Sequence, residues 1–158
     1  MDDFSDTLWN DVEDLDLARS LLEEGKWNLV IVKGARVLFC SRDRGVVPLF
    51  QFVRSDKASL HNAALADRIV GLAVAMLCLY AKISSVYAVV ASQGAIDMLK
   101  GKGVAVTYKN LVPHISNYDG TGLCPFEKMA KDAGSPAHLF STLKSVFGSS
   151  SDDGVAFP

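Results

Sequence analysis

The chain alternates short apolar segments with turn-forming residues, a pattern that is typical of an α/β fold. Residues 11–24 place apolar side chains every three or four positions, which predicts an amphipathic helix that ends at Gly25. Two strands are predicted next, Trp27–Val32 and Arg36–Cys40, and the tight turn Lys33–Ala35 joins them. This first part of the chain therefore predicts a helix followed by an antiparallel hairpin.

The middle of the chain carries its longest apolar stretch. After a short predicted helix at Pro48–Phe52, residues Leu60–Lys82 are apolar nearly all round beyond Arg68, which predicts one long helix covered on both sides. Gly71 would then lie inside this helix and mark a close packing contact. The longest uncharged run, Ile69–Ala81, has 13 residues, whereas a membrane span needs roughly 20. We therefore expect a buried core helix here.

The second half of the chain predicts further strands and helices in alternation. A continuous apolar run at Val86–Val90 indicates a central strand covered on both faces. The elements predicted after it are a helix at Gln93–Lys100, a strand at Val104–Tyr108, a short edge strand at Leu111–Ile115, and helices at Pro125–Ala133 and Pro136–Phe147, the last with Ser135 as its N-cap. We expect an α/β fold, a three-layer α/β/α sandwich with a mixed sheet, parallel wherever a helix connects two strands.

Length and composition are those of one globular domain. The chain has 158 residues, of which 49% are hydrophobic and 22% charged, values that exclude a disordered chain or a coiled coil. We expect a domain at residues 11–147, a flexible acidic leader at 1–10 and a disordered tail at 148–158. No basic residue precedes Arg19, so no secretory signal is predicted. Three cysteines form no paired framework, and we expect a reducing cytoplasm.

Charge is distributed unevenly along the chain. Residues 1–16 hold seven acidic residues and no basic one, and without these and the two acids of the tail, 16 basic residues stand against nine acidic ones. Five arginines fall between positions 36 and 68, and they predict either an anion-binding face or an ordinary solvated face. The basic residues lack interleaved aromatic side chains, so nucleic-acid binding is not expected.

Four stretches carry a family resemblance: Leu21–Gly25, Arg44–Leu49, Ala66–Gly71 and, most specifically, Asp119–Glu127. On these residues and on the order of its elements, the chain resembles the cytidine-deaminase-like fold. It is most similar to a small prokaryotic family of unknown function with that fold. The resemblance covers about residues 17–135 and implies a fold without an assigned activity.

The zinc site of true deaminases is missing from this pattern. Those enzymes use a His or Cys ligand, a Glu for proton transfer and a Pro-Cys-x-x-Cys motif. Here Ala63 stands where the Glu is expected if His61 were a ligand, and the turn Ser92–Ile96 has no cysteine. His114 and His138 show no metal-ligand spacing either. We therefore expect no metal, no cofactor and no zinc-dependent deamination.

Two residues are candidates for catalysis, Cys124 and Asp67. Cys124 precedes Pro125 at a predicted helix start, where the helix dipole favours a thiolate nucleophile. Asp67 is placed near the start of the predicted long helix, where it is a candidate general base. Each has an alternative structural role: Cys124 as a small residue at an N-cap, and Asp67 as a complement to the helix dipole.

Candidate ligand-binding residues surround these two positions. Arg68, Arg44 and Arg42 are candidate anion clamps, and the turn Asp119-Gly120-Thr121-Gly122 is a candidate backbone nest for phosphate. In an open α/β sheet such residues meet at the carboxyl ends of the parallel strands. Solvated arginines and an ordinary turn remain the alternatives.

Two hypotheses about function follow. The first is a zinc-independent enzyme that acts on a small anionic or nucleotide-like ligand through Cys124 and Asp67. The second is a non-catalytic small-ligand-binding or regulatory module of the same fold. In either case we expect no membrane association and a homodimer.

Overall fold

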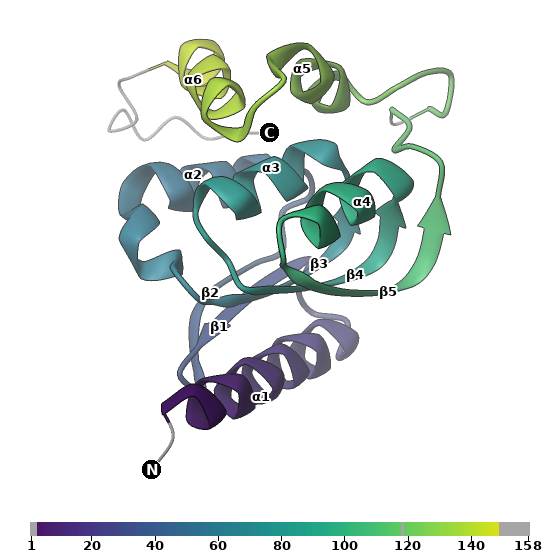
Figure 1. The fold of residues 1–158 in the computed structure, drawn as a ribbon. Helices are drawn as coiled ribbons and strands as arrows, with labels where there is room; N and C mark the ends of the chain where they lie inside the picture. Colours follow the sequence, from purple (N-terminus) through teal and green to yellow (C-terminus); the bar gives the residue numbers. More distant parts are fainter. Residues whose placement is uncertain (1–2, 118, 149–158) are drawn as a thin grey trace.

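Five strands form one mixed sheet in the order β2-β1-β3-β4-β5 (Figure 1). The computed structural model describes residues 3–117 and 119–148. In this part of the chain, β1 pairs antiparallel with both β2 and β3, and β3, β4 and β5 run parallel. The strand bounds are β1 Leu29–Lys33, β2 Arg36–Ser41, β3 Ala64–Val70, β4 Ser85–Ser92 and β5 Ala105–Val112.

Helices cover both faces of this sheet (Figure 1). Helix α1 lies across one face and contacts β1, β3 and β4, whereas α3 and α4 pack together on the other. Helices α5 and α6 pack on α3 from outside. The helix bounds are α1 Asp3–Glu23, α2 Val47–Asp56, α3 Leu72–Tyr80, α4 Gln93–Gly101, α5 Pro125–Ala133 and α6 Pro136–Phe147, with a 3₁₀ turn, η1, at Lys57–Leu60.

The core has two parts because side chains alternate across the strands. Along β1, Leu29 and Ile31 join the large cluster under α2–α6, while Val30 and Val32 join a smaller one under α1. The small cluster is completed by Ala18, Leu22, Ala66 and Tyr87. The sheet is therefore buried on both faces where α1 covers it, which accounts for the continuous apolar run of β1.

The predicted long helix at Leu60–Lys82 is wrong. The structure divides this stretch into η1, strand β3 and helix α3, and Gly71 is the junction between strand and helix. A uniformly apolar run has neither the period of a helix nor that of a strand, so a fully buried strand cannot be told from a buried helix by pattern alone. As a result Asp67 and Arg68 lie in a central strand and not near a helix start.

Other boundaries agree more closely with the predictions. The hairpin is antiparallel, with Gly34 and Ala35 in the left-handed region, and Ser135 caps α6 by accepting a hydrogen bond from His138 N at 3.2 Å. The separate strand at Leu111–Ile115 is replaced by a longer β5 that ends at Val112. The α/β class and the mixed sheet are confirmed.

The N-terminal region is more structured than predicted. Helix α1 begins at Asp3, within the segment expected to be loose. Asp14, one of the seven acidic residues of the segment 1–16, is only 4% exposed and accepts hydrogen bonds from Gly34 N and Ala35 N, both at 2.8 Å. This carboxylate fixes α1 to the hairpin turn. The domain limits 11–147 stay a prediction, and the predicted tail lies outside the described residues from 149 onward.

The contact of Asp14 with the hairpin turn predicts a stability effect. Asp14→Ala removes two hydrogen bonds to an ionised acceptor, so we expect the free energy of unfolding to fall by about 2 kcal/mol in urea denaturation. The matched control is Glu13→Ala, which changes the exposed neighbouring acid and should alter stability by less than about 0.5 kcal/mol. Equal effects of the two variants would contradict this role.

Candidate functional site

At the carboxyl end of β3, which is part of the predicted ligand site, a side chain of the protein itself occupies the start of α3. Glu127 of α5 is 5% exposed and reaches the first turn of α3. Its Oε1 accepts a hydrogen bond from Leu72 N at 2.7 Å, and its Oε2 accepts one from Ala73 N at 3.0 Å. Helix N-termini bind anions through such free N–H groups. Glu127 therefore fills the anion site that the fold creates at this helix.

Gly71 makes room for this carboxylate. Its φ of −101° is open to any residue, so backbone strain does not explain the glycine. A Cβ at this position would overlap with the carboxyl group of Glu127 and with Ile115 Cγ1. The close contact predicted for Gly71 is thus present, although the partner is a carboxylate and not a packed helix.

The turn at Asp119–Gly122 is closed by its own hydrogen bonds. Gly120 N donates to Asn117 O, Thr121 N donates to Asp119 Oδ1, and Gly122 N donates to Asn117 Oδ1. The Thr121 hydroxyl also donates to Asp119 Oδ1 at 2.7 Å, and these bonds lower the pKa of the Asp119 carboxyl. The N–H groups of the expected phosphate nest are therefore already engaged within the turn.

Cys124 is the N-cap of α5, as the sequence predicts, and it is half-buried. Its backbone N–H donates to Ile115 O at 3.1 Å, and its carbonyl accepts from Glu127 N and Lys128 N. Its side chain makes no cap hydrogen bond. No hydrogen bond or ion pair joins Cys124 to Asp67 in the described part of the chain, and their joint role in catalysis stays a prediction.

Asp67 is buried within the sheet and not exposed in a cleft. It is 8% exposed, and it lies between Leu29 of β1 and Ala88 of β4 in the register. Burial raises the pKa of its carboxyl to about 7, against the weaker opposing effect of a hydrogen bond from Ile69 N. Burial, together with the nearby Asp67, also raises the pKa of the Cys78 thiol. Below neutral pH this environment therefore favours the protonated form of Asp67.

Arg68 serves the packing of α1. Its Nε donates to Asn28 Oδ1 at 2.9 Å, and its Nη2 donates to Leu22 O at 3.0 Å. The Leu22 carbonyl belongs to the last turn of α1, whose orphan acceptors need such donors. Arg54 instead lies on α2, across the sheet, and donates to Gly148 O. The arginines between 36 and 68 therefore do not form a single anion-binding face.

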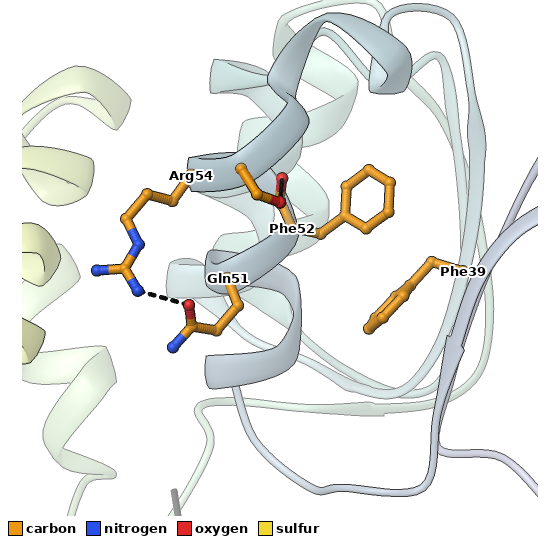
Figure 2. A pocket seen from close by; sticks show the side chains of 5 residues that line it. Phe39, Gln51, Phe52 and Arg54 are labelled. Atoms are coloured by element: carbon orange, nitrogen blue, oxygen red, sulfur yellow. Dashed lines mark hydrogen bonds between the residues drawn. The ribbon is translucent and has the colours of Figure 1, made fainter. Parts of the chain in front are cut away.

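Two adjoining hollows lie between edge strand β2 and helix α2, and we call them together the β2–α2 groove. They have volumes of about 320 and 220 Å³ and share Phe39 and Gln51, near the lower end for ligand pockets. Figure 2 shows the rings of Phe39 and Phe52 near each other, at an angle, in the lining of the larger hollow. Their centroids are 5.2 Å apart. Ser55 and Arg54 also line the larger hollow; Ser41, Asp43, Arg44, Val47 and Pro48 line the smaller one.

The smaller hollow combines a cation with a helix N-terminus. Arg44 is exposed and has no ion pair within the described residues. Helix α2 begins beside it: its N-cap, Val46, makes no side-chain cap hydrogen bond, and its first turn has no acidic residue. Arg42 is directed elsewhere, since its guanidinium lies 5.1 Å from the ring centroid of Trp27. Of the three predicted arginine clamps, Arg44 is the one in a hollow.

Sequence reasoning missed Glu127 as a cap and missed the aromatic lining of the groove. Glu127 looked like a first-turn residue of its own helix, and only the glycine at 71 hinted at a close neighbour. Phe39 and Phe52 looked like core residues of a strand and a helix.

No set of three or more His, Cys, Asp or Glu residues with metal-binding geometry occurs among the described residues. None of the described helices is long and apolar enough to span a bilayer.

The chain is similar to one protein family in sequence and to a solved structure in fold. The sequence model of the TM1506 family, described as a domain of unknown function (DUF1893), matches residues 17–147. The crystal structure of a DUF1893 family protein (TM1506) from Thermotoga maritima has a similar fold, with a TM-score of 0.77 and 27% sequence identity. The match covers 85% of this chain and 90% of that one. No curated protein matches the chain.

The contact between Gly71 and Glu127 predicts a steric effect at a position without backbone strain. Gly71→Ala should lower the free energy of unfolding by about 2–3 kcal/mol, because the new Cβ displaces the carboxylate from the N-terminus of α3. The matched control is Gly94→Ala in α4, where the nearest side-chain atom, Leu72 Cδ1, is 3.8 Å away. That variant should melt like the parent. In a chain that already carries Glu127→Ala, Gly71→Ala should lower the free energy of unfolding by less. An equal loss in the two backgrounds would rule out the proposed clash.

The burial of Asp67 predicts a pH dependence of stability. An acid whose pKa is raised on folding binds more protons in the folded state, so stability falls as pH rises from about 4 to about 7 and is level above that. Over this pH range the free energy of unfolding should fall by at most about 4 kcal/mol. Asp67→Asn should remove this decline and make the protein more stable than the parent at pH 8, as measured by urea unfolding at several pH values. Parallel pH profiles for the two proteins would show that Asp67 is not the group responsible.

Proposed function

The chain belongs to the DUF1893 family, a domain of unknown function, and we propose that it binds a small anionic or nucleotide-like ligand in the β2–α2 groove. In this proposal the protein is a binding or regulatory module of the α/β fold. The ligand's anionic group lies against Arg44 and the first turn of α2, and its apolar or planar part lies against Phe39.

One observation carries the proposal: Arg44 and the start of α2 line the same hollow. An unpaired guanidinium and a helix N-terminus without an acidic cap both favour an anion, and together they define its position. The N-termini of α3 and α4, two other helices on the same face, are occupied. Ser92 caps α4, and the carboxylate of Glu127 caps α3. Asp43 in the same hollow opposes a highly charged ligand and favours one with a single anionic group.

Catalysis by Cys124 and Asp67 is the weaker alternative. An acid–thiol mechanism requires both groups to reach one substrate. Asp67 is enclosed by the sheet and Cys78 lies near it, whereas Cys124 caps α5 beside Ile115. The geometry therefore supports binding better than turnover.

The resemblance to the cytidine-deaminase-like fold belongs to the same proposal. Its support is the order of a hairpin followed by strand–helix units and helices on both faces of a mixed sheet. The first turns of α3 and α4, Leu72–Ala75 and Gln93–Ile96, hold no His, Cys or Glu. We therefore propose the deaminase-like, three-layer arrangement without the deaminase zinc ligands. The three free cysteines support a reducing, cytoplasmic compartment.

Ligand titration followed by backbone amide NMR tests the proposed site. Two probes are used, inorganic phosphate and a nucleoside monophosphate. Both should shift the amide signals of Val47 and Leu49 in the first turn of α2, and the nucleotide should also shift signals near Phe39. Arg44→Gln should weaken binding of both probes roughly tenfold or more, because it removes a charge-assisted hydrogen bond.

The matched control is Arg36→Gln, which removes the same charge from an exposed position of β2 outside the groove. This variant should bind both probes like the parent. Equal weakening by the two variants would indicate general electrostatic attraction and no site at Arg44. Shifts confined to the turn at 119–122, or no shifts with either probe, would contradict the proposal.

A further inference from the structure

The outer edge of the sheet at β5 is open. β5 is the last strand of the sheet and pairs with β4 along one side, while six of its eight residues are exposed. Within the described ranges, no strand pairs with its other side (Figure 1). A free strand edge presents a row of unpaired N–H and C=O groups, and it therefore accepts another strand.

β5 has few of the features by which proteins usually protect an edge, and Lys109 is the one that it carries. It contains no proline, its single charged residue is Lys109, and its pairing with β4 has no register shift of the kind seen between β1 and β2. It also exposes two large apolar side chains, Tyr108 at 39% and Leu111 at 43%. The opposite edge, β2, is shorter, irregular in register and flanked by the β2–α2 groove.

We infer that β5 pairs antiparallel with β5 of a second copy of this chain, around a two-fold axis at Tyr108. A two-fold axis perpendicular to the sheet continues it across both copies and places side chains of the same face opposite each other. The occupant is a second copy because the strand is complementary to itself in this register. This inference is independent of the proposed ligand site.

The side chains select the register. Centred on Lys109, the pairing would place two like charges directly opposite, which is destabilising. Centred on Asn110, it would place Pro113, which has no N–H, opposite Thr107. Centred on Tyr108, it places Lys109 opposite Thr107 of the second copy and Leu111 opposite Ala105. The two Tyr108 rings then lie side by side, a favourable cross-strand pair.

Light scattering at several protein concentrations, combined with charge variants, tests the pairing. The parent chain should have the mass of a dimer. Thr107→Lys creates two Lys–Lys contacts across the axis and should weaken the dimer roughly tenfold, whereas Thr107→Glu creates two Glu–Lys contacts and should strengthen it. Thr107 is exposed, so both variants should fold, which circular dichroism and thermal melting check.

Cross-linking tests the register directly. Under mild oxidation Tyr108→Cys should form a disulfide-linked dimer, because this position faces itself across the axis. Lys109→Cys faces Thr107 and should not cross-link faster than the parent chain with its native cysteines. A monomeric parent chain, or a dimer indifferent to Thr107→Lys that does not cross-link through position 108, would overturn the inference.

Discussion

The hydrogen bonds from the first turn of α3 to the carboxylate of Glu127 join two helices that are far apart in the sequence. They tie α5, a helix from the outer layer, to the helix that follows the central strand β3. Glu127 is 5% exposed, and the two N–H groups provide a hydrogen-bond donor for each of its carboxyl oxygens. Gly71 is the structural requirement for this contact, since any side chain there would displace the carboxylate.

This contact also occupies a position at which ligands of open α/β sheets usually bind. In open α/β sheets the ligand usually lies at the carboxyl ends of the parallel strands, beside helix N-termini. Here Glu127 closes that position at α3, Ser92 caps α4, and the turn before α5 is bonded to itself. The start of α2 beside Arg44 lies elsewhere, next to the edge of the antiparallel hairpin. The anion site that we propose there is therefore also at a helix N-terminus, but at another part of the sheet.

Two buried carboxylates, those of Asp14 and Glu127, accept hydrogen bonds from backbone N–H groups. Asp14 binds the N–H groups of the hairpin turn, and Glu127 binds those of α3. Asp67 differs, because the hydrogen bond that it accepts from Ile69 N is long, at 3.3 Å, and burial dominates the pKa of its carboxyl. A buried acid with a weak partner is kept neutral near and below pH 7, and it then behaves as a polar core residue.

The sequence by itself determined the elements whose signals are local. The hairpin, α4 and the Ser135 cap of α6 follow from turn residues, periodicity and capping chemistry within a few positions. Only the tertiary structure decided the split of Leu60–Lys82, because a uniformly apolar stretch carries no period, and burial from both sides made residues 64–70 a strand. It also decided that Glu127 caps a helix 54 residues away in the sequence. Both outcomes depend on contacts between residues that are far apart in the sequence. A local sequence pattern therefore cannot predict them.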